Sequence, residues 1–394
     1  MGSLLIVLIY ISFVSLGLPD SILGSAWPVM QPNLGVPLSY AGIISMIISV
    51  GTIVSSLLSD RLNKKLGTGL VTAISTAMTA LALLGFSLSR SYWLLCVIAV
   101  PYGLGAGAVD AALNNYVALH YKARHMSWLH ARWGIGATAG PVIMGQFLAV
   151  GNNWPGVYWA ISFVQAGLAV LLFCSLPLWR RKTESDEEAV VREPIPLRKV
   201  LKIPGVPFVM LAFLGYCAFE QTCGLWAASY LFTVKGLSAD AAATCGAAYF
   251  FGITGGRFLS GFITEKVGDR RMIRFGAIIA ATGIILVILP INSFILSVAG
   301  LIIAGLGCAP VYPSVIHSTP KNFGPENSQA VIGVQMASAY VGSCLAPALF
   351  GVLAQAISLT LYPFYLLFFA VLLLSMTELL NRLKDRSANT ENTV

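Results

Sequence analysis

Two twelve-residue stretches decide the fold: GIGATAGPVIMG at Gly134–Gly145, and YVGSCLAPALFG at Tyr340–Gly351. Each lies within a long apolar run, and when the two are aligned Pro141 falls opposite Pro347. Small residues at such spacing are typical of helices that approach one another closely inside a membrane. The match, at an offset of about 200 residues, predicts that the chain consists of two related halves.

Three other matches occur in the same order in both halves. They are a Gly-Leu-Gly helix, an acid followed by a base after a helix, and an acid six or seven residues before a tryptophan. One such match would be weak evidence, but four in register indicate duplication. The matched positions are Gly103 and Gly305, Asp60-Arg61 and Glu265-Lys266, and Asp20 with Trp27 and Glu220 with Trp226.

The composition is that of a membrane protein. Of the 394 residues, 57% are apolar and 10% are charged, whereas soluble domains carry roughly 25% charged residues. Apolar runs of about 20 residues, enough to cross a bilayer as a helix, recur along the chain. We therefore predict an all-α polytopic membrane protein with twelve transmembrane helices in two pseudo-symmetric six-helix bundles, and not an enzyme. The predicted spans are 3–30, 38–59, 68–89, 92–120, 126–150, 155–179, 205–233, 239–264, 272–290, 293–319, 327–355 and 359–381.

The positive charge is concentrated on one side of the predicted membrane. Connections after even-numbered spans, together with the C-terminal tail, hold nearly all exposed Lys and Arg residues, and the exceptions are Arg90 and Lys235. Because cytoplasmic loops are enriched in these residues, we expect both termini to be cytoplasmic. The net charge of +8 then reflects topology and not a nucleic-acid partner. We expect a monomeric, multi-pass protein of the cell membrane.

A polar segment, Arg180 to Lys202, separates the halves. It is broken by prolines and has too little apolar surface to fold alone. We therefore predict an N-terminal six-helix bundle over residues 1–179 and a cytoplasmic linker over 180–204. A C-terminal six-helix bundle with a short cytoplasmic tail is predicted over 205–394.

Cysteine and glycine patterns predict packing and no cofactor. The seven cysteines all lie in apolar runs, without the spacing of metal ligands or redox pairs. Glycine clusters near 103–107 and 252–256 resemble phosphate loops, but they lie inside apolar spans with no strand before them. We expect these glycines to be close-packing positions and expect no metal and no cofactor.

The predicted layout of two parallel six-span repeats resembles the major facilitator superfamily. GTIVSSLLSDRLNKKLG, from Gly51, is similar to the superfamily's signature between the second and third spans, although Asn63 stands where glycine is usual. The resemblance implies a cytoplasmic latch that pairs in one conformation and releases in the other. The gating residues that we predict are Asp60, Arg61, Arg257 and Glu265.

Within that superfamily the chain resembles sugar–proton symporters of the fucose-permease type. The similar motifs are GLPDSILGSAWP, GLG-x4-D-x3-N, LHARWGIGATAGP, GGRFLSG and GLGCAPVYPS. In that family, acids of the first and fourth spans serve proton coupling and sugar contact, which implies these roles for Asp20 and Asp110, with Asn114 nearby. Asp110 replaces the family's Glu and Asn115 replaces a proline, so the identity of the sugar does not transfer.

Charged residues inside the predicted spans are the main candidates for proton coupling. A charge in the bilayer costs about 2.5–3.5 kcal/mol and needs a partner or a wet cavity. Asp110 and Arg132 lie at similar depth on adjacent spans and are suited to form an ion pair, either permanent or opened by a proton. Arg257 is expected at the cytoplasmic edge, near Glu265. The proton-coupling candidates are Asp20, Asp110, Glu220, Arg132 and His130.

Aromatic and amide side chains complete the candidate site. A pyranose ring stacks on flat aromatic faces while its hydroxyls bind polar groups, although tryptophans also anchor or pack helices in membranes. The predicted substrate-binding residues are Asp20, Trp27, Asp110, Asn114, Asn115, Trp133, Glu220, Gln221, Trp226, Tyr312 and Gln335.

These residues predict proton-coupled alternating-access transport of a small polar solute, such as a sugar. The alternative is a proton-coupled exporter of drug-like or amphipathic compounds, in which one embedded acid and an apolar cavity are usual. Three embedded acids with neighbouring amides favour the hydrophilic solute. The sequence leaves open the solute, the direction of transport and the choice between protons and sodium.

Overall fold

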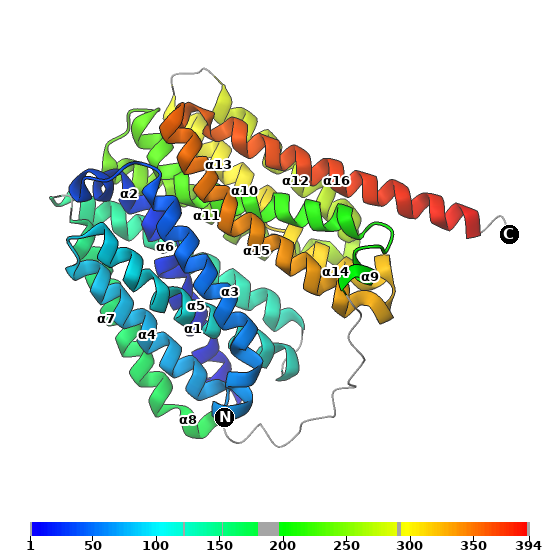
Figure 1. The fold of residues 1–394 in the computed structure, drawn as a ribbon, viewed down its shortest axis with the longest axis horizontal. Helices are drawn as coiled ribbons and strands as arrows, with labels where there is room; N and C mark the ends of the chain where they lie inside the picture. Colours follow the sequence, from blue (N-terminus) through cyan, green and yellow to red (C-terminus); the bar gives the residue numbers. More distant parts are fainter. Residues whose placement is uncertain (1, 121–122, 152, 180–196, 290–292, 392–394) are drawn as a thin grey trace.

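The computed structural model describes residues 2–120, 123–151, 153–179, 197–289 and 293–391, which are helical apart from short connections (Figure 1). Ten segments of these residues are long and apolar enough to cross a membrane. The prediction of an all-helical, membrane-spanning chain is thus confirmed. The helices are α1 (Gly2–Asp20), α2 (Ile22–Leu34), α3 (Tyr40–Leu66), α4 (Thr68–Leu88), α5 (Tyr92–His120), α6 (Ala123–Ala149), α7 (Trp154–Cys174), α8 (Leu176–Trp179), α9 (Leu197–Val200), α10 (Val206–Thr233), α11 (Ala239–Val267), α12 (Asp269–Ile288), α13 (Phe294–Cys308), α14 (Val311–Phe323), α15 (Pro325–Ala356), the short 3-10 helix η2 (Leu359–Leu361) and α16 (Tyr362–Glu391).

The first and the tenth predicted spans are each divided into two helices. The first breaks at Ser21, between α1 and α2, and the tenth breaks at Ala309 and Pro310, between α13 and α14. A proline lacks the N–H that the helix needs, and its ring clashes with a carbonyl of the preceding turn. Pro19 and Pro310 therefore account for breaks that the hydropathy pattern alone does not reveal.

The helices pack as two groups, α1–α8 and α10–α16 (Figure 1). The groups meet where α6 packs on α11, α3 on α15, and α2 on α10. Helices α6 and α11 have 27 and 29 residues but are not among the ten apolar segments. Much of the surface of each faces the other, so they need less apolar surface than a helix in lipid. Residues 180–196 of the predicted linker lie outside the described residues.

We call the side where α1 begins and α16 ends the terminal side, and the opposite side the far side. The two groups converge on the far side and diverge toward the terminal side (Figure 1). On the far side, Ser39 at the start of α3 donates a hydrogen bond to Gln355 near the end of α15. Nearby, Gly42 lies directly against the backbone of Ala348. The two halves are therefore closed against each other on the far side.

The glycines of the two opening stretches allow helices to touch. A Cβ atom on Gly136 would lie 2.0 Å from the carbonyl oxygen of Val14 in α1, and one on Gly342 would lie 2.5 Å from that of Leu214 in α10. Glycines near 103–107 and 252–256 are also packed against neighbouring helices, and Gly255 is the loosest of them. The prediction that these are packing positions is confirmed.

Replacing Gly136 by alanine should destabilise the protein by about 1–3 kcal/mol, because the added methyl group forces α6 away from α1. Gly167 of α7 is the matched control, since a Cβ atom there meets nothing within 4 Å. Gly167→Ala should be neutral or slightly stabilising. The melting temperatures of the two purified variants provide the measurement, and equal values would contradict the close contact.

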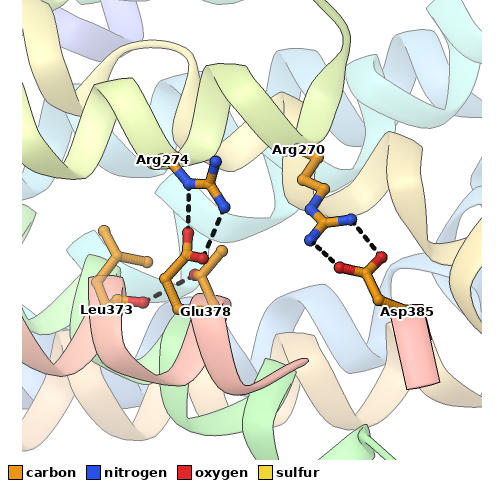
Figure 2. A network of polar contacts seen from close by, with 6 residues as sticks. Arg270, Arg274, Leu373, Glu378 and Asp385 are labelled. Atoms are coloured by element: carbon orange, nitrogen blue, oxygen red, sulfur yellow. Dashed lines mark hydrogen bonds and ion pairs between the residues drawn. The ribbon is translucent and has the colours of Figure 1, made fainter. Parts of the chain in front are cut away.

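On the terminal side, two arginines of α12 form ion pairs with acidic residues near the end of α16 (Figure 2). Arg270 donates to both carboxylate oxygens of Asp385 at 2.7 and 2.6 Å, and Arg274 donates in the same way to Glu378. Such bidentate pairs fix geometry as well as charge. The last helix therefore continues beyond the predicted span, to Glu391, while it remains tied to α12.

Candidate functional site

A cavity of about 240 Å³ lies between the two groups of helices. Its walls combine hydroxyl groups, aromatic rings and two carboxyl groups. Asp20 and Ser21, at the break between α1 and α2, both line this cavity. The lining residues are Pro19, Asp20, Ser21, Leu23, Gly24, Ser45, Ile48, Ser49, Thr52, Leu83, Phe86, Tyr102, Trp133, Tyr158, Glu220, Gln221, Gly224, Leu225, Phe250, Tyr340 and Ser343.

Asp20 is held by two donors from neighbouring helices. Its Oδ2 accepts a hydrogen bond from Nε1 of Trp133 at 2.8 Å, and its Oδ1 accepts one from the hydroxyl of Tyr102 at 3.3 Å. Gly17 makes the first of these bonds possible, since a Cβ atom there would lie 2.1 Å from the carbonyl oxygen of Trp133. No cation of the described residues forms an ion pair with Asp20.

Glu220 forms an ion pair with Arg257. Nη2 of the arginine lies 3.2 Å from Oε1 of Glu220, and the two side chains are 14% and 12% exposed. The guanidinium group also lies over the ring of Trp133, 5.2 Å from its centroid. The expected place of Arg257, at the cytoplasmic edge beside Glu265, is therefore wrong. α11 runs to Val267, which puts Arg257 about 15 Å inside the helix end, where it needs a carboxylate partner.

Asp110 and Arg132 do not pair with each other. Asp110 accepts a hydrogen bond from Nδ2 of Asn114, one turn along α5, at 3.0 Å. Arg132 lies over the ring of Tyr10, with its guanidinium carbon 4.5 Å from the centroid. The suggested ion pair between these two described residues is thus replaced by a local hydrogen bond and by stacking on α1.

His130 lies between the two halves, on the terminal side of Trp133. Its ring centroid is 5.9 Å from that of Phe13 in α1 and 6.4 Å from that of Tyr312 in α14. Neither His130 nor Tyr312 is among the lining residues of the cavity. The hydroxyl of Tyr312 donates to the sulfur of Met336 at 3.4 Å.

The matched tryptophans Trp27 and Trp226 are packing residues. Both are fully buried, and Nε1 of each donates to a backbone carbonyl at 2.9 Å, of Leu38 and Pro347 respectively. Neither is among the described residues that line the cavity. Gln335 is also fully buried, with its amide bonded to Thr319. The expectation that these three residues contact a solute is therefore corrected: each is occupied elsewhere.

Two of the predicted gating residues, Arg61 and Glu265, lie at the terminal side. Arg61 and Glu265 are exposed near the ends of α3 and α11. The side chain of Asp60, like that of the predicted contact Asn115, lies outside the described part of the chain. Within the described residues, no three His, Cys, Asp or Glu side chains are grouped as metal ligands.

Several lining residues were missed by sequence reasoning. Ser45, Ser49 and Thr52 occupy positions i, i+4 and i+7 of α3 and so share one face. This polar stripe on an otherwise apolar helix was a signal that could have found them. Tyr158 lies in an apolar helix and carries no such signal. The buried hydroxyls of Tyr158 and Ser21 have no hydrogen-bond partner among the residues that the structure describes.

The family model of the Major Facilitator Superfamily matches residues 9–256 and residues 227–393. The chain belongs to this superfamily. It is therefore a multi-pass membrane protein of a family of transporters, as the sequence motifs predicted.

Relatives within the superfamily are distant. The chain is 26% identical over 309 residues to the uncharacterized transporter y4wD of Sinorhizobium fredii, with 77% of this chain and 78% of that protein covered. It is 25% identical over 241 residues to the glucose/mannose transporter GlcP of Bacillus subtilis, with 58% of each covered. A hexuronate transporter of the same organism is 22% identical over 302 residues, which cover 74% of this chain and 70% of that protein.

Solved structures of the superfamily have the same fold. A variant of the nucleoside transporter NupG gives a TM-score of 0.77 at 12% identity, with 95% of this chain and 98% of that one covered. A bacterial homologue of the human lysosomal transporter Spinster gives a TM-score of 0.69 at 14% identity, with 98% and 97% covered. At such identities the similarity concerns the fold alone.

Proposed function

We propose that this member of the superfamily is a secondary active transporter that moves a small polar solute, a sugar or sugar-like molecule, together with protons. The central cavity carries this proposal. Its lining combines the hydroxyl-bearing residues Ser45, Ser49 and Thr52 with aromatic residues, which is the combination that a sugar needs: rings for its C–H faces and polar groups for its hydroxyls. The unpartnered hydroxyls of Tyr158 and Ser21 offer further bonds to a solute, because buried polar groups normally have partners.

The size of the cavity favours a small solute over a drug-like one. Its volume of about 240 Å³ lies below the range of roughly 300–1,000 Å³ that is typical of sites for drug-sized ligands. The names of two relatives, which refer to glucose and mannose and to hexuronate, agree with a sugar-sized solute. The exporter of amphipathic compounds is therefore the weaker alternative.

Asp20 is the proton-coupling acid that we propose for this cavity. It faces the space between the halves and accepts hydrogen bonds from neutral donors only. Glu220 also lines the cavity, but Arg257 neutralises it. Asp110, bonded to Asn114 and nearer the terminal side, is placed to exchange protons between Asp20 and that side. The resemblance to fucose-permease-type symporters supports the same two acids.

We further propose that the chain spans the membrane twelve times, as six-helix bundles over residues 1–179 and 205–394. In this layout α6 and α11 are the two more polar spans, sheltered against each other. With both termini cytoplasmic, as the distribution of Lys and Arg predicts, the diverging terminal side (Figure 1) faces the cytoplasm. Transport then alternates between this conformation and one that is open on the far side. We expect a monomer in the cell membrane.

Thermal stability of the purified protein tests the proposed solute class. Hexoses, hexuronates, nucleosides and apolar cations are added one at a time, at pH 5.5 and 7.5. A solute that binds only the folded state raises the melting temperature by mass action. We expect a shift with a sugar or sugar-like compound, whereas shifts with apolar cations alone would favour the exporter and reject this proposal.

Tyr158→Phe identifies the binding site in the same assay. The hydroxyl has no protein partner, so its removal should leave the ligand-free melting temperature unchanged. Loss of one hydrogen bond to the solute should weaken binding by about three- to tenfold. The matched control is Tyr365→Phe, whose hydroxyl bonds to the carbonyl of Ala346 away from the cavity. This control should lower the melting temperature and leave solute affinity intact.

A further inference from the structure

One side chain contacts the charged groups of both halves. Trp133, on α6 of the first half, donates a hydrogen bond through Nε1 to Asp20 at 2.8 Å. The face of the same indole lies under the guanidinium of Arg257 on α11 of the second half, 5.2 Å from its carbon. Phe250 contacts the indole edge to face, with centroids 6.3 Å apart. Asp20 of the first half and the Glu220–Arg257 pair of the second half are therefore linked through the indole ring of Trp133.

We propose that Trp133 is the positioning residue that couples protonation of Asp20 to the Glu220–Arg257 pair across the interface between the halves. This inference rests on the proposed proton-coupled transport and adds the element that connects the proton site to the second half. When Asp20 is ionised, the indole N–H donates to a charged acceptor, and such bonds are roughly twice as strong as neutral ones. A proton on Asp20 weakens this bond and frees the ring to turn.

Movement of the ring acts directly on the second half. The guanidinium of Arg257 is largely buried, and the indole face of Trp133 and the carboxylate of Glu220 both contact it. If the ring turns, Arg257 loses this face and must reorient with its partner. Protonation in the first half thus changes the contact surface of α11.

The backbone around Trp133 is held by close contacts between helices. Gly17 lies against the carbonyl of Trp133, and Gly136 lies against that of Val14, so α6 cannot shift along α1. The next residue, Gly134, faces Thr254 of α11, where a Cβ atom would lie 2.4 Å from its Oγ1. Trp133 is therefore adjacent in sequence to a close contact between α6 and α11, and a change in its ring is transmitted to that contact.

Other titratable groups that surround Asp20 and Trp133 come from five helices. They are Tyr102 and Asp110 of α5, His130 of α6, Tyr158 of α7, Glu220 of α10, and Tyr340 of α15. The tyrosines keep their protons between pH 5 and 8, and Glu220 is paired. Asp110 and His130 remain as competing sources of a pH response, and the experiment must separate them from Asp20.

Intrinsic tryptophan fluorescence of the purified full-length protein, titrated from pH 8 to pH 5, tests the coupling without any solute. We expect a reversible transition in the wild type that is lost in Asp20→Asn and in Trp133→Phe. Trp133→Phe retains a smaller aromatic face for Arg257 but removes the N–H donor and the fluorophore itself, so its loss of signal shows that the transition is reported by Trp133. Asp110→Asn and His130→Gln should keep the transition, as should Trp226→Phe, whose indole bonds to a carbonyl. A transition that survives in Asp20→Asn, or that disappears in Asp110→Asn or His130→Gln alone, would overturn the inference.

A second set of variants tests whether Arg257 of the second half is coupled to the Trp133–Asp20 contact. Arg257→Gln should shift the midpoint of the transition, because the cation over the ring is part of the environment of the Trp133–Asp20 pair. Arg274→Gln is the matched control, since Arg274 binds Glu378 at the terminal side and should leave the midpoint unchanged. Equal midpoints in wild type and Arg257→Gln would reject the coupling. Failure of the proposed solute class appears separately, as a normal fluorescence transition with no thermal shift by any sugar.

Discussion

Glu220→Gln should destabilise the protein by about 3 kcal/mol and abolish transport. The substitution leaves the guanidinium of Arg257 desolvated in the centre of the molecule with no carboxylate, and arginine cannot release its proton. Removing one partner of a buried pair costs about 3–5 kcal/mol. The lower value applies because the two side chains retain 14% and 12% exposure. The melting temperature of the purified variant is the measurement.

The reverse substitution, Arg257→Gln, should be less harmful, and least harmful at low pH. Glu220 would then lack its partner, but a carboxylate can be neutralised by a proton whereas a guanidinium cannot. The double variant Glu220→Gln with Arg257→Gln removes both charges and should recover most of the lost stability. Glu265→Gln, at an exposed acid of the same region of the sequence, serves as control and should have little effect. A Glu220→Gln variant as stable as this control would show that the pair is not desolvated.

The pattern of small residues was enough to predict that helices within each half pack closely. Gly136 and Gly342 occupy equivalent places in the two opening stretches, and each touches the first helix of its own half. Such contacts depend on the absence of a side chain, which the sequence displays directly. We inferred the repeat from the same kind of pattern, since it required only residues that match in register.

The partners of the embedded charges could not be predicted in this way. Arg257 was assigned to the helix edge because it is close to Glu265 in sequence, yet it lies about 15 Å before the end of α11 at Val267 and is largely buried. Its partner Glu220 lies on another helix, 37 residues away in sequence, and no local pattern joins the two. Asp110 and Arg132 were paired because they lie at a similar depth in the predicted membrane. Their side chains have different partners, Asn114 for Asp110 and the ring of Tyr10 for Arg132.

The tryptophans illustrate a second limit of the sequence. Trp27 and Trp226 match between the halves, and they also match in structure, since both bond to a backbone carbonyl in the interior. Trp27 and Trp226 therefore both have a packing role, whereas Trp133 lies at the cavity without a matching tryptophan. α10 is apolar on most of its surface, so periodicity could not indicate which of its faces meets a solute.

Asp20→Asn should abolish proton-driven accumulation of the solute while solute exchange persists. Asparagine has the same shape and can still accept the hydrogen bond from Nε1 of Trp133, so the cavity should keep its form. The asparagine side chain cannot bind and release a proton, however, so the proton gradient can no longer drive uptake of the solute. A pH difference of two units supplies about 2.7 kcal/mol per proton, which corresponds to an accumulation of about 100-fold. In the variant, the solute concentrations inside and outside vesicles should become equal.

Proteoliposomes provide the measurement, with uphill uptake under a pH gradient compared with exchange of labelled solute at equal pH. Asp240→Asn, in the first turn of α11 at the far side, is the matched control and should accumulate solute like the wild type. Accumulation that persists in Asp20→Asn but is lost in Asp110→Asn would transfer the proton site to α5. Loss of exchange together with accumulation would mean instead that the carboxylate of Asp20 binds the solute itself. The two assays thus separate a coupling role from a binding role for an acid that faces the cavity without a cationic partner among the described residues.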